Sequence, residues 1–368
     1  MVSILFRLGA LYQNGTEAFV MNVYRKLNNK INIDFILNNP TITPYYKEVI
    51  DGGARIFVCP PRKPNPIKSV ISEYMFFKNH AKEYDAIHFC YGSLADITLI
   101  FFAYWYKIPI RILHSHNSSC KGIHSRILHN LFKPIANKLT THHFACSEKA
   151  GAFFASKRVH YEIINNGIDI NRYSLNIKKR NEIRKILSIP DDCIVIGHVG
   201  RFTTVKNHDF ILDVFFEYLK LNHNSILMLI GIGELEENIR TKAENLGISS
   251  KILFMGLRND VGDLMQAMDL FLMPSLFEGL PFVLVEAQAA GLPCVISNNI
   301  DNGVNITGNV KFMSLDSTAK EWAMSIVSDL TNFDRKNQDT LIRENGYDIN
   351  TTAEYLLKIY NSNNNVSE

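Results

Sequence analysis

Segments typical of buried strands alternate with segments typical of helices along the whole chain, and the alternation begins again past its midpoint. Apolar runs such as VSILFRL, INIDFILN and YDAIHFC are each followed by a helical stretch, and CIVIGHVG, SILMLIG and DLFLMPS repeat the pattern. Alternating strands and helices form parallel sheets covered by helices on both faces. A chain of 368 residues is longer than one such domain usually is. The sequence therefore predicts two α/β domains, at residues 1–165 and 166–340. Residues 341–368 are expected to form a C-terminal helix that crosses back to the first domain, followed by a frayed tail.

Composition narrows the class of protein. The six cysteines are scattered without a close pair, which argues against a disulfide framework and fits a reducing cytoplasm. The longest apolar run, Ile97 to Tyr106, is about half of a bilayer span, so we expect a buried helix there.

The net charge of +3 hides an asymmetry between the two halves of the chain. Residues 1–165 hold 20 Lys and Arg against 10 Asp and Glu, and residues 166–368 hold 19 Lys and Arg against 26 Asp and Glu. The basic half could contact an anionic lipid or acceptor, or could be an ordinary solvated surface.

The stretch MPSLFEGLPFVLVEAQAAGLPC, residues 273–294, has the layout of strand, turn and helix. Glu278 lies in the predicted turn with Gly279, Leu280 and Pro281, and Glu286 lies in what we expect to be the first turn of the helix. Such a layout points backbone N–H groups at an anion. Carboxylates accept hydrogen bonds from hydroxyl groups. The pattern therefore suggests a nucleotide sugar, while two solvated glutamates on an ordinary α/β turn remain the alternative.

Three further loops follow strands in the second half. Arg201 and Lys206, in GHVGRFTTVKNH, are suited to phosphate oxygens if they lie at the carboxyl end of a strand, and are otherwise two solvated cations. Gly231 and Gly233 resemble half of a dinucleotide fingerprint but lack the third glycine, so a nicotinamide cofactor is a weak interpretation. The loop at 257–258, with Leu257 and Arg258, could contact a flat base through its backbone.

In the first half, Gly15 and Thr16 follow a predicted strand and open a helix, at a place where a phosphate could approach. His114 and His116 lie two residues apart at the end of another strand, and hence on one face. Metal ligation, a core or rim position, and a polar role at the crevice all remain open for them. No carboxylate or cysteine with ligand spacing joins the pair.

Taken in order, these motifs resemble the retaining glycosyltransferases of family GT4, within it the bacterial enzymes of capsule, exopolysaccharide and O-antigen assembly. The resemblance spans nearly the whole chain. It is strongest over GHVGRFTTVKNHDF and PSLFEGLPFVLVEAQAAGLPC, and good over RILHSHN, HFACSEKA and NNGID. It implies the GT-B fold, in which two Rossmann-like domains with parallel sheets face each other across a cleft. The first domain would then be on the acceptor side, and the second would bind the nucleotide sugar.

The resemblance also implies residue roles. Glu278 would bond the sugar hydroxyls, Glu286 the ribose hydroxyls, and Arg201 and Lys206 the diphosphate. His116 would shape the reacting face. The remaining donor-binding positions it suggests are Gly15, Thr16, Gly231, Gly233, Leu257, Arg258, Gly279, Leu280, Phe282 and Val283.

Two positions depart from the family pattern. Asn14 stands where a glycine is usual, and we expect it to tolerate a left-handed conformation. Pro281 also replaces a glycine and has no N–H, so donors must come from neighbours such as Phe282 and Val283.

The implied reaction moves a hexose or N-acetylhexosamine from a nucleoside diphosphate sugar, UDP-sugar favoured, to a lipid-linked oligosaccharide, with no metal or other cofactor and no nucleic acid partner. A cytoplasmic enzyme is expected, and a peripheral contact with the inner membrane through residues 45–78 is left open. Two alternatives remain: a nucleotide-sugar 2-epimerase on the same fold, and a non-catalytic nucleotide-sugar-binding assembly protein.

Overall fold

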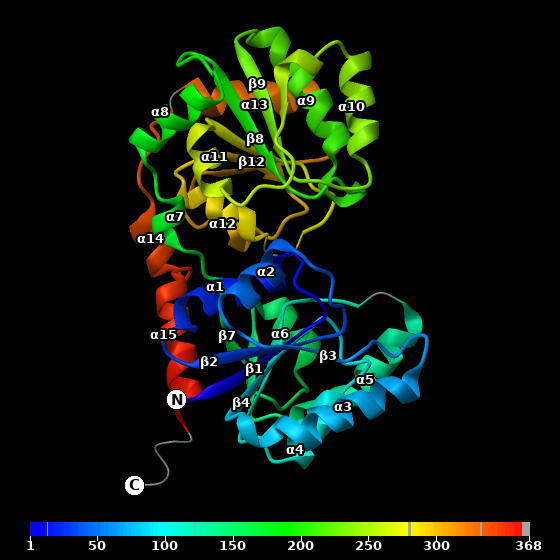
Figure 1. The fold of residues 1–368 in the computed structure, drawn as a ribbon. Coiled ribbons are helices and arrows are strands. Elements are labelled where there is room, and N and C mark those ends of the chain that lie inside the picture. The colour runs from blue at the N-terminus through cyan, green and yellow to red at the C-terminus, as the bar shows by residue number, and fades with distance from the viewer. Residues whose placement is uncertain (13, 121, 279–280, 332, 363–368) are drawn as a thin grey trace. The chain divides into compact units, whose positions relative to one another are not determined.

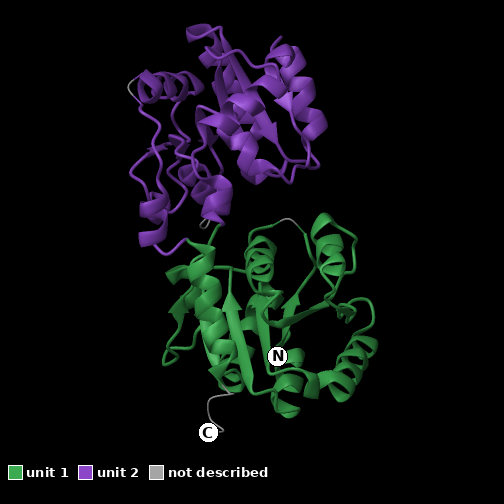
Figure 2. Cartoon of the chain, turned by 60° about the vertical axis from the view of Figure 1, so that its left-hand side comes forward, with its two compact units in different colours: residues 1–168, 348–368 green, residues 169–347 purple. Residues whose placement is uncertain are grey.

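The protein, seen in a computed structural model, is described over residues 1–12, 14–120, 122–278, 281–331 and 333–362. It divides into two compact units: unit 1 comprises residues 1–168 and 348–368, and unit 2 comprises residues 169–347 (Figure 2). The chain enters unit 2 at Asp169, three residues after the boundary that the sequence suggested. It leaves unit 2 after Tyr347 rather than at residue 341. Each unit is organised around one parallel sheet (Figure 1).

Unit 1 has a seven-stranded sheet in which every neighbouring pair is parallel. Its spatial order is β3 (Ile56–Val58), β2 (Asn32–Leu37), β1 (Ser3–Leu8), β4 (Ala86–Tyr91), β5 (Ile110–Ser115), β6 (His142–Ala145) and β7 (Glu162–Ile163). The helices are α1 (Gly15–Leu27), α2 (Pro44–Asp51), α3 (Pro66–His80), α4 (Thr98–Trp105), α5 (Ile123–Leu139), α6 (Glu148–Phe154) and α15 (Ile349–Tyr360).

Local sequence explains where several of these helices begin. Both α2 and α3 start with a proline, which lacks the N–H that a helix leaves unpaired at this position. The residue before each proline caps the helix: Thr43 accepts a hydrogen bond from the N–H of Tyr46, and Asn65 from that of Lys68. These caps fix where the two helices begin.

Unit 2 has a six-stranded parallel sheet. Its order is β10 (Ile252–Phe254), β9 (Ser225–Ile230), β8 (Ile194–Val199), β11 (Leu270–Met273), β12 (Cys294–Ser297) and β13 (Val310–Met313). The helices are α7 (Ile170–Tyr173), α8 (Ile177–Ile186), α9 (His208–Leu221), α10 (Glu236–Asn245), α11 (Val261–Ala267), α12 (Phe282–Ala289), α13 (Ala319–Thr331) and α14 (Asp339–Glu344). Trp322 of α13 is fully buried in the core of this unit, and its indole N–H donates to the carbonyl of Ser314 at 2.9 Å.

The two sheets share one topology. When the strands of each unit are numbered along the chain, their spatial order in the sheet is 3-2-1-4-5-6, and unit 1 adds a seventh strand beside the sixth. This is the doubly wound arrangement of Rossmann folds, in which the strand order reverses between the first and the fourth strand while all strands remain parallel. The predicted pair of Rossmann-like α/β domains is therefore confirmed.

Some sequence-based expectations were wrong. The short edge strand β13 was missed, because four residues between polar loops carry little periodic signal. The apolar run at 97–106 was expected to be a buried helix, but α4 leaves Phe101, Tyr104 and Trp105 exposed. Within the part of the chain that is described, no helix has both the length and the apolar character needed to cross a bilayer.

Candidate active site

The strongest candidate site lies at the carboxyl edge of the unit 2 sheet, where the loops after β8 and β11 meet. These strands are neighbours in the sheet and flank the point where strand order reverses. In open α/β sheets, ligands bind outside the carboxyl ends of the strands at this point. The loop after β8 carries Arg201 and Lys206, and the loop after β11 carries Glu278. The sequence prediction that these cations follow a strand end is confirmed.

Hydrogen bonds hold the two loops together. The N–H of Leu276 donates to the carbonyl of Val205 at 2.8 Å, and the side-chain amide of Asn207 donates to the carbonyl of Pro274 at 3.1 Å. Asn207 adopts a left-handed conformation with φ of 56°, which asparagine tolerates better than most residues. The turn between Lys206 and α9 is thereby fixed against the neighbouring loop.

Lys206 and Glu278 form the central ion pair of this edge. Lys206 Nζ lies 2.7 Å from Glu278 Oε1, and the two side chains are only 18% and 17% exposed. The angles of this contact are poor for a hydrogen bond, and Glu278 Oε1 has no other partner among the described residues. The pair thus places a half-buried cation beside a carboxylate that can still accept a hydrogen bond.

Arg201 is placed differently from Lys206. Its guanidinium Nη2 lies 3.6 Å from Glu234 Oε2, and the Arg201 side chain is 68% exposed. An exposed pair at this distance contributes little stability, so it does not hold the guanidinium in one position. Arg201 therefore remains available to an anionic ligand at the same sheet edge.

The glycine turn after β9 packs directly under the loop that carries Arg201. Gly231 has a φ of +139°, and a Cβ there would lie 2.1 Å from the carbonyl oxygen of Gly200. A Cβ at Gly233 would lie 2.4 Å from the carbonyl oxygen of Phe202. The two glycines are thus required by close backbone packing. The sequence had assigned them to ligand contact, a role that stays a prediction.

Leu257 and Arg258 follow β10 at the same edge of the sheet. Leu257 is exposed, and Arg258 is paired with Asp260 through Nη2 and Oδ2 at 2.5 Å. An exposed leucine beside a loop backbone is compatible with the predicted contact to a flat base. That role also stays a prediction.

Glu286 lies on α12, which begins at Phe282 after Pro281. It is the fifth residue of the helix, so the expectation that it lies in the first turn was wrong. Burial raises its pKa, against the opposing effects of the Tyr173 hydroxyl and the Arg172 charge.

As the first two residues of α12, Phe282 and Val283 carry N–H groups that have no acceptor within the helix. The predicted positions Gly279 and Leu280 lie outside the described residues.

Two buried histidines beside Lys206 were not identified from the sequence. His198 Nδ1 is 2.8 Å from the carbonyl of Leu272, while His198 Nε2 and both ring nitrogens of His208 have no partner among the described residues. Burial, together with the nearby charge of Lys206, lowers the pKa of His208 to about 4. Both histidines lie in the GHVGRFTTVKNH stretch. The motif alone does not indicate that these two side chains are buried next to Lys206.

In unit 1, Gly15 and Thr16 begin α1, after a loop that follows β1. Asn14 is the N-cap residue of this helix and has an extended conformation with φ of −110°, so the left-handed conformation that asparagine tolerates is not adopted here. A Cβ at Gly15 would meet nothing within 4 Å. Among the described residues, none crowds this position, which is compatible with the predicted approach of a phosphate.

His116 lies just past the end of β5, and its ring is 4.1 Å from that of His114 between centroids. The expectation that the two lie on one face is confirmed. Burial lowers the pKa of His116 to about 3, although the neighbouring Asn166 side chain favours the charged form. Both His116 nitrogens and Asn166 Oδ1 lack a well-aligned partner among the described residues. Unpaired buried polar atoms are costly, so this neutral histidine is suited to bonding a ligand.

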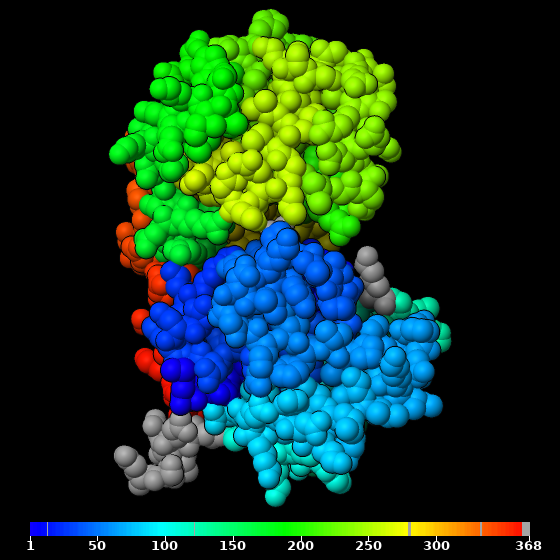
Figure 3. Space-filling model, viewed as in Figure 1, coloured from blue at the N-terminus to red at the C-terminus, as the bar shows by residue number. Residues whose placement is uncertain are grey.

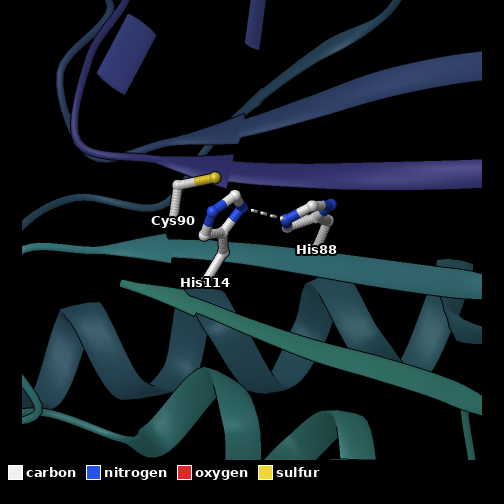
Figure 4. Close-up of side chains that lie close together, drawn as sticks. All are labelled: His88, Cys90 and His114. Atoms are coloured by element: carbon white, nitrogen blue, oxygen red, sulfur yellow. Dashed lines mark hydrogen bonds between the residues drawn. The ribbon is translucent and has the colours of Figure 1, made fainter. Parts of the chain in front are cut away.

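His114 also belongs to a cluster with His88 and Cys90 (Figure 4), whose ligating atoms lie within 4.8 Å of one another. Two imidazoles and a thiol could ligate a soft transition metal. Here the facing nitrogens, His88 Nε2 and His114 Nδ1, form a 3.1 Å hydrogen bond, and the Tyr360 hydroxyl is 2.7 Å from His88 Nδ1. We interpret the cluster as a hydrogen-bonded array that orients His114 against His116.

Comparison with known proteins identifies the family of this chain. Residues 179–325 match the family model described as "Glycosyl transferases group 1". EpsF of Bacillus subtilis (strain 168), whose name assigns it provisionally as a glycosyltransferase, is 32% identical over 375 residues, covering 97% of this chain and 96% of EpsF. The chain therefore belongs to the group 1 glycosyl transferases and is a glycosyltransferase. A galactosyltransferase of Escherichia coli, named for UDP-Gal and α-D-GlcNAc-diphosphoundecaprenol, is 27% identical over 268 residues, or 68% of each chain.

Solved structures show the same fold. HepE of Anabaena in complex with UDP and glucose matches with a TM-score of 0.76 at 17% identity, over 98% of this chain and 100% of HepE. WaaG, a glycosyltransferase involved in lipopolysaccharide biosynthesis, matches with a TM-score of 0.67 at 17% identity, over 97% and 99%. The predicted GT-B fold class is confirmed. At such identities these structures bear on the fold alone.

The structure thus brings together part of the predicted site. In unit 2, Arg201, Lys206, Gly231, Gly233 and Glu278 lie on adjoining loops. The predicted positions Gly15, Thr16 and His116 belong to unit 1.

Proposed function

We propose that this glycosyltransferase moves a hexose or N-acetylhexosamine from a UDP-sugar to a lipid-linked oligosaccharide, with retention of the anomeric configuration, in surface polysaccharide biosynthesis. It would act in the cytoplasm, at the inner face of the inner membrane. The Lys206–Glu278 pair is the observation on which this proposal rests most. It combines a cation suited to a diphosphate with a carboxylate suited to sugar hydroxyls, at the sheet position where such ligands bind.

The charges expected during the reaction fit these side chains. A departing nucleoside diphosphate carries about two negative charges that must be stabilised as the glycosidic bond breaks. Lys206 and Arg201 would provide positive charge, and the N–H groups of Phe282 and Val283, which have no acceptor within α12, would add hydrogen bonds. Glu278 would accept bonds from the sugar and Glu286 from the ribose. Gly15, Thr16 and His116 are proposed to complete the donor site.

Relatives support the choice of substrate class. The Escherichia coli relative is named for a UDP-sugar donor and a diphosphoundecaprenol acceptor, and other relatives are named for capsular polysaccharide and O-antigen biosynthesis. The epimerase alternative has weaker support. A provisional UDP-N-acetylglucosamine 2-epimerase of Listeria monocytogenes is only 13% identical, a likeness of fold. A non-catalytic binding protein is disfavoured by membership of an enzyme family and by the intact Lys206–Glu278 pair.

A transfer assay tests this proposal. The purified protein is incubated with a panel of UDP-sugars and a synthetic undecaprenyl-diphosphate-linked acceptor, and the product is examined by NMR. We expect one donor to yield a new glycosidic bond with the anomeric configuration of that donor. An inverted product would contradict retention, and an epimerised sugar formed without acceptor would favour the epimerase.

Chelation is expected to leave this activity largely intact. Lys206, Arg201 and helix N–H groups would stabilise the leaving diphosphate, so that task needs no divalent ion. The measurement is the initial rate after treatment with EDTA and dialysis, compared with the same enzyme given excess Mg²⁺. A loss of nearly all activity that Mg²⁺ restores would show that a metal performs the task assigned to these cations.

Donor affinity is expected to fall on acidification, at a pH above that at which an ordinary glutamate titrates. The raised pKa of Glu286 means that its carboxylate is protonated sooner as the pH falls, and a protonated carboxyl is a weaker acceptor for ribose hydroxyls. Glu286→Gln should weaken donor binding about fivefold to tenfold at neutral pH. It should also reduce the further loss of donor affinity on acidification. Isothermal titration across pH values measures both effects, with the exposed Glu237→Gln as control. If the Glu286→Gln protein loses donor affinity on acidification as the unmodified protein does, Glu286 does not bind the ribose.

A further inference from the structure

Helix α5 of unit 1 presents its apolar side to solvent. Five aliphatic residues lie along one stripe and are exposed: Ile123, Ile127, Leu128, Leu131 and Ile135. Their spacing is that of the stripe by which a helix normally packs on a core. A helix with this stripe turned to solvent exposes apolar area that a monomer in water would ordinarily bury.

The inward side of α5 is correspondingly polar. His129 accepts a hydrogen bond from the N–H of Leu94 at 3.0 Å, and its other nitrogen contacts the carbonyl of Phe153 at 3.0 Å. Asn137 donates to the carbonyl of Phe154 and accepts from the N–H of Ser156. These bonds fix the rotation of the helix. The outward direction of the aliphatic stripe is therefore a built feature of the fold.

Helix α3 repeats this arrangement. Its exposed stripe is Ile67, Val70, Ile71, Tyr74 and Met75, at positions i, i+3, i+4, i+7 and i+8.

On the opposite side of α3, Ser69 and Glu73 are buried. Arg62 binds both, at 2.7 Å to the hydroxyl of Ser69 and at 2.6 Å to the carboxylate of Glu73. The buried charge of Glu73 is thus paired, which fixes α3 with its apolar stripe outward.

Helix α4 lies between these two helices and packs against both. Figure 1 shows the three helices side by side in unit 1, and Figure 3 shows the surface of α3 and α4 in light blue and cyan. Its exposed residues are Phe101, Tyr104 and Trp105. Together the outward sides of α3, α4 and α5 form one apolar surface, which we call the α3–α5 face.

The charges on this face are of one sign. The described residues of the three helices contain a single acid, Glu73, which is buried and paired with Arg62. The exposed cations are Lys68, Lys78, Arg126 and Lys138, whereas the ammonium of Lys133 donates to the carbonyl of Phe153. Lysine and arginine among exposed aliphatic and aromatic side chains match an anionic lipid surface, where apolar groups enter the acyl boundary and cations meet headgroups. A second copy of the chain would bring like charges together.

We propose that the α3–α5 face docks on a membrane surface that contains anionic phospholipid. The side chains of Trp105, Ile127 and Leu131 enter the headgroup region, and the surrounding lysines and arginines contact phosphate. This surface covers the C-terminal part of the segment 45–78, and it extends over α4 and α5, which the sequence did not implicate. The inference does not depend on which sugar is transferred.

The first test uses the unmodified full-length protein and vesicles without any acceptor. The chain has two tryptophans, of which Trp105 is 66% exposed and Trp322 is fully buried. Vesicles of phosphatidylethanolamine and phosphatidylglycerol should shift the Trp105 emission to shorter wavelength and protect it from iodide. Vesicles of phosphatidylcholine alone should do so weakly. No change in emission with the anionic vesicles would overturn the proposal.

The second test compares matched variants by vesicle flotation. Ile127→Ser with Leu131→Ser should weaken binding at least tenfold. The control, Ile186→Ser with Met324→Ser, alters equally exposed apolar residues of unit 2 and should bind as the unmodified protein does. Equal binding by both variants would refute the assignment of the face. So would a concentration-dependent dimer in sedimentation velocity that only the α5 variant abolishes, because a second copy would then cover the face. Retention of donor binding by both variants separates this outcome from failure of the proposed function.

Discussion

Lys206→Met should lower kcat by a factor of about 10² to 10³ while the protein stays folded. Methionine retains the apolar length that packs over Gly200, where Lys206 Cδ lies 3.2 Å from a Cβ placed on that glycine. The substitution therefore removes the charge and little else. Because Lys206 Nζ lies 2.7 Å from Glu278 at the reversal point of the sheet, its loss should remove positive charge that the departing diphosphate requires. Initial rates at saturating donor and acceptor measure the effect.

A surface lysine of the same unit provides the control for this variant. Lys220 pairs with Glu217 on the exposed side of α9, and Lys220→Met should change kcat less than twofold. Thermal melting of both variants shows whether either has lost structure. A folded Lys206→Met enzyme with a nearly normal kcat would remove Lys206 from the catalytic group.

Gly231→Ala should destabilise unit 2 by about 3 kcal/mol or more. An alanine would have to adopt a φ near +139°, which side-chain-bearing residues rarely do, and its Cβ would lie 2.1 Å from the carbonyl oxygen of Gly200. That oxygen belongs to the backbone, so relief requires movement of the loop that carries Arg201 and Lys206. The midpoint and slope of urea unfolding give the change in free energy.

Gly308→Ala separates the two causes of this loss. Gly308 also has a positive φ, of +80°, but a Cβ there meets nothing within 4 Å. Its substitution should cost only about 1 kcal/mol, the penalty of the backbone conformation. Equal losses in the two variants would show that the close approach to Gly200 contributes nothing.

The fold was predictable from sequence because parallel sheets leave a strong signal. Strands buried on both faces appear as continuous apolar runs, and β8, β9 and β11 were all recognised in this way. Short edge elements carry less signal, as the omission of β13 shows. The apolar run of α4 was misjudged for a related reason, since apolar content alone does not tell a core-facing side from a face that remains exposed.

The site was predictable in part. Strand ends and turn residues located Lys206 and Glu278, since both follow apolar runs on neighbouring strands. The packing roles of Gly231 and Gly233 required coordinates, because they depend on backbone atoms of the adjacent loop. The buried His198 was overlooked for the same reason. Its neighbours across the sheet, such as Leu272, are distant in sequence.

The account depends most on the claim that Lys206 binds the diphosphate of the donor. Isothermal titration of the unmodified and Lys206→Met proteins with UDP and with uridine tests it directly. We expect the substitution to weaken UDP binding at least about tenfold, or 1.4 kcal/mol, and to leave uridine binding unchanged. Equal affinities of the two proteins for UDP, or an equal loss for both ligands, would contradict it.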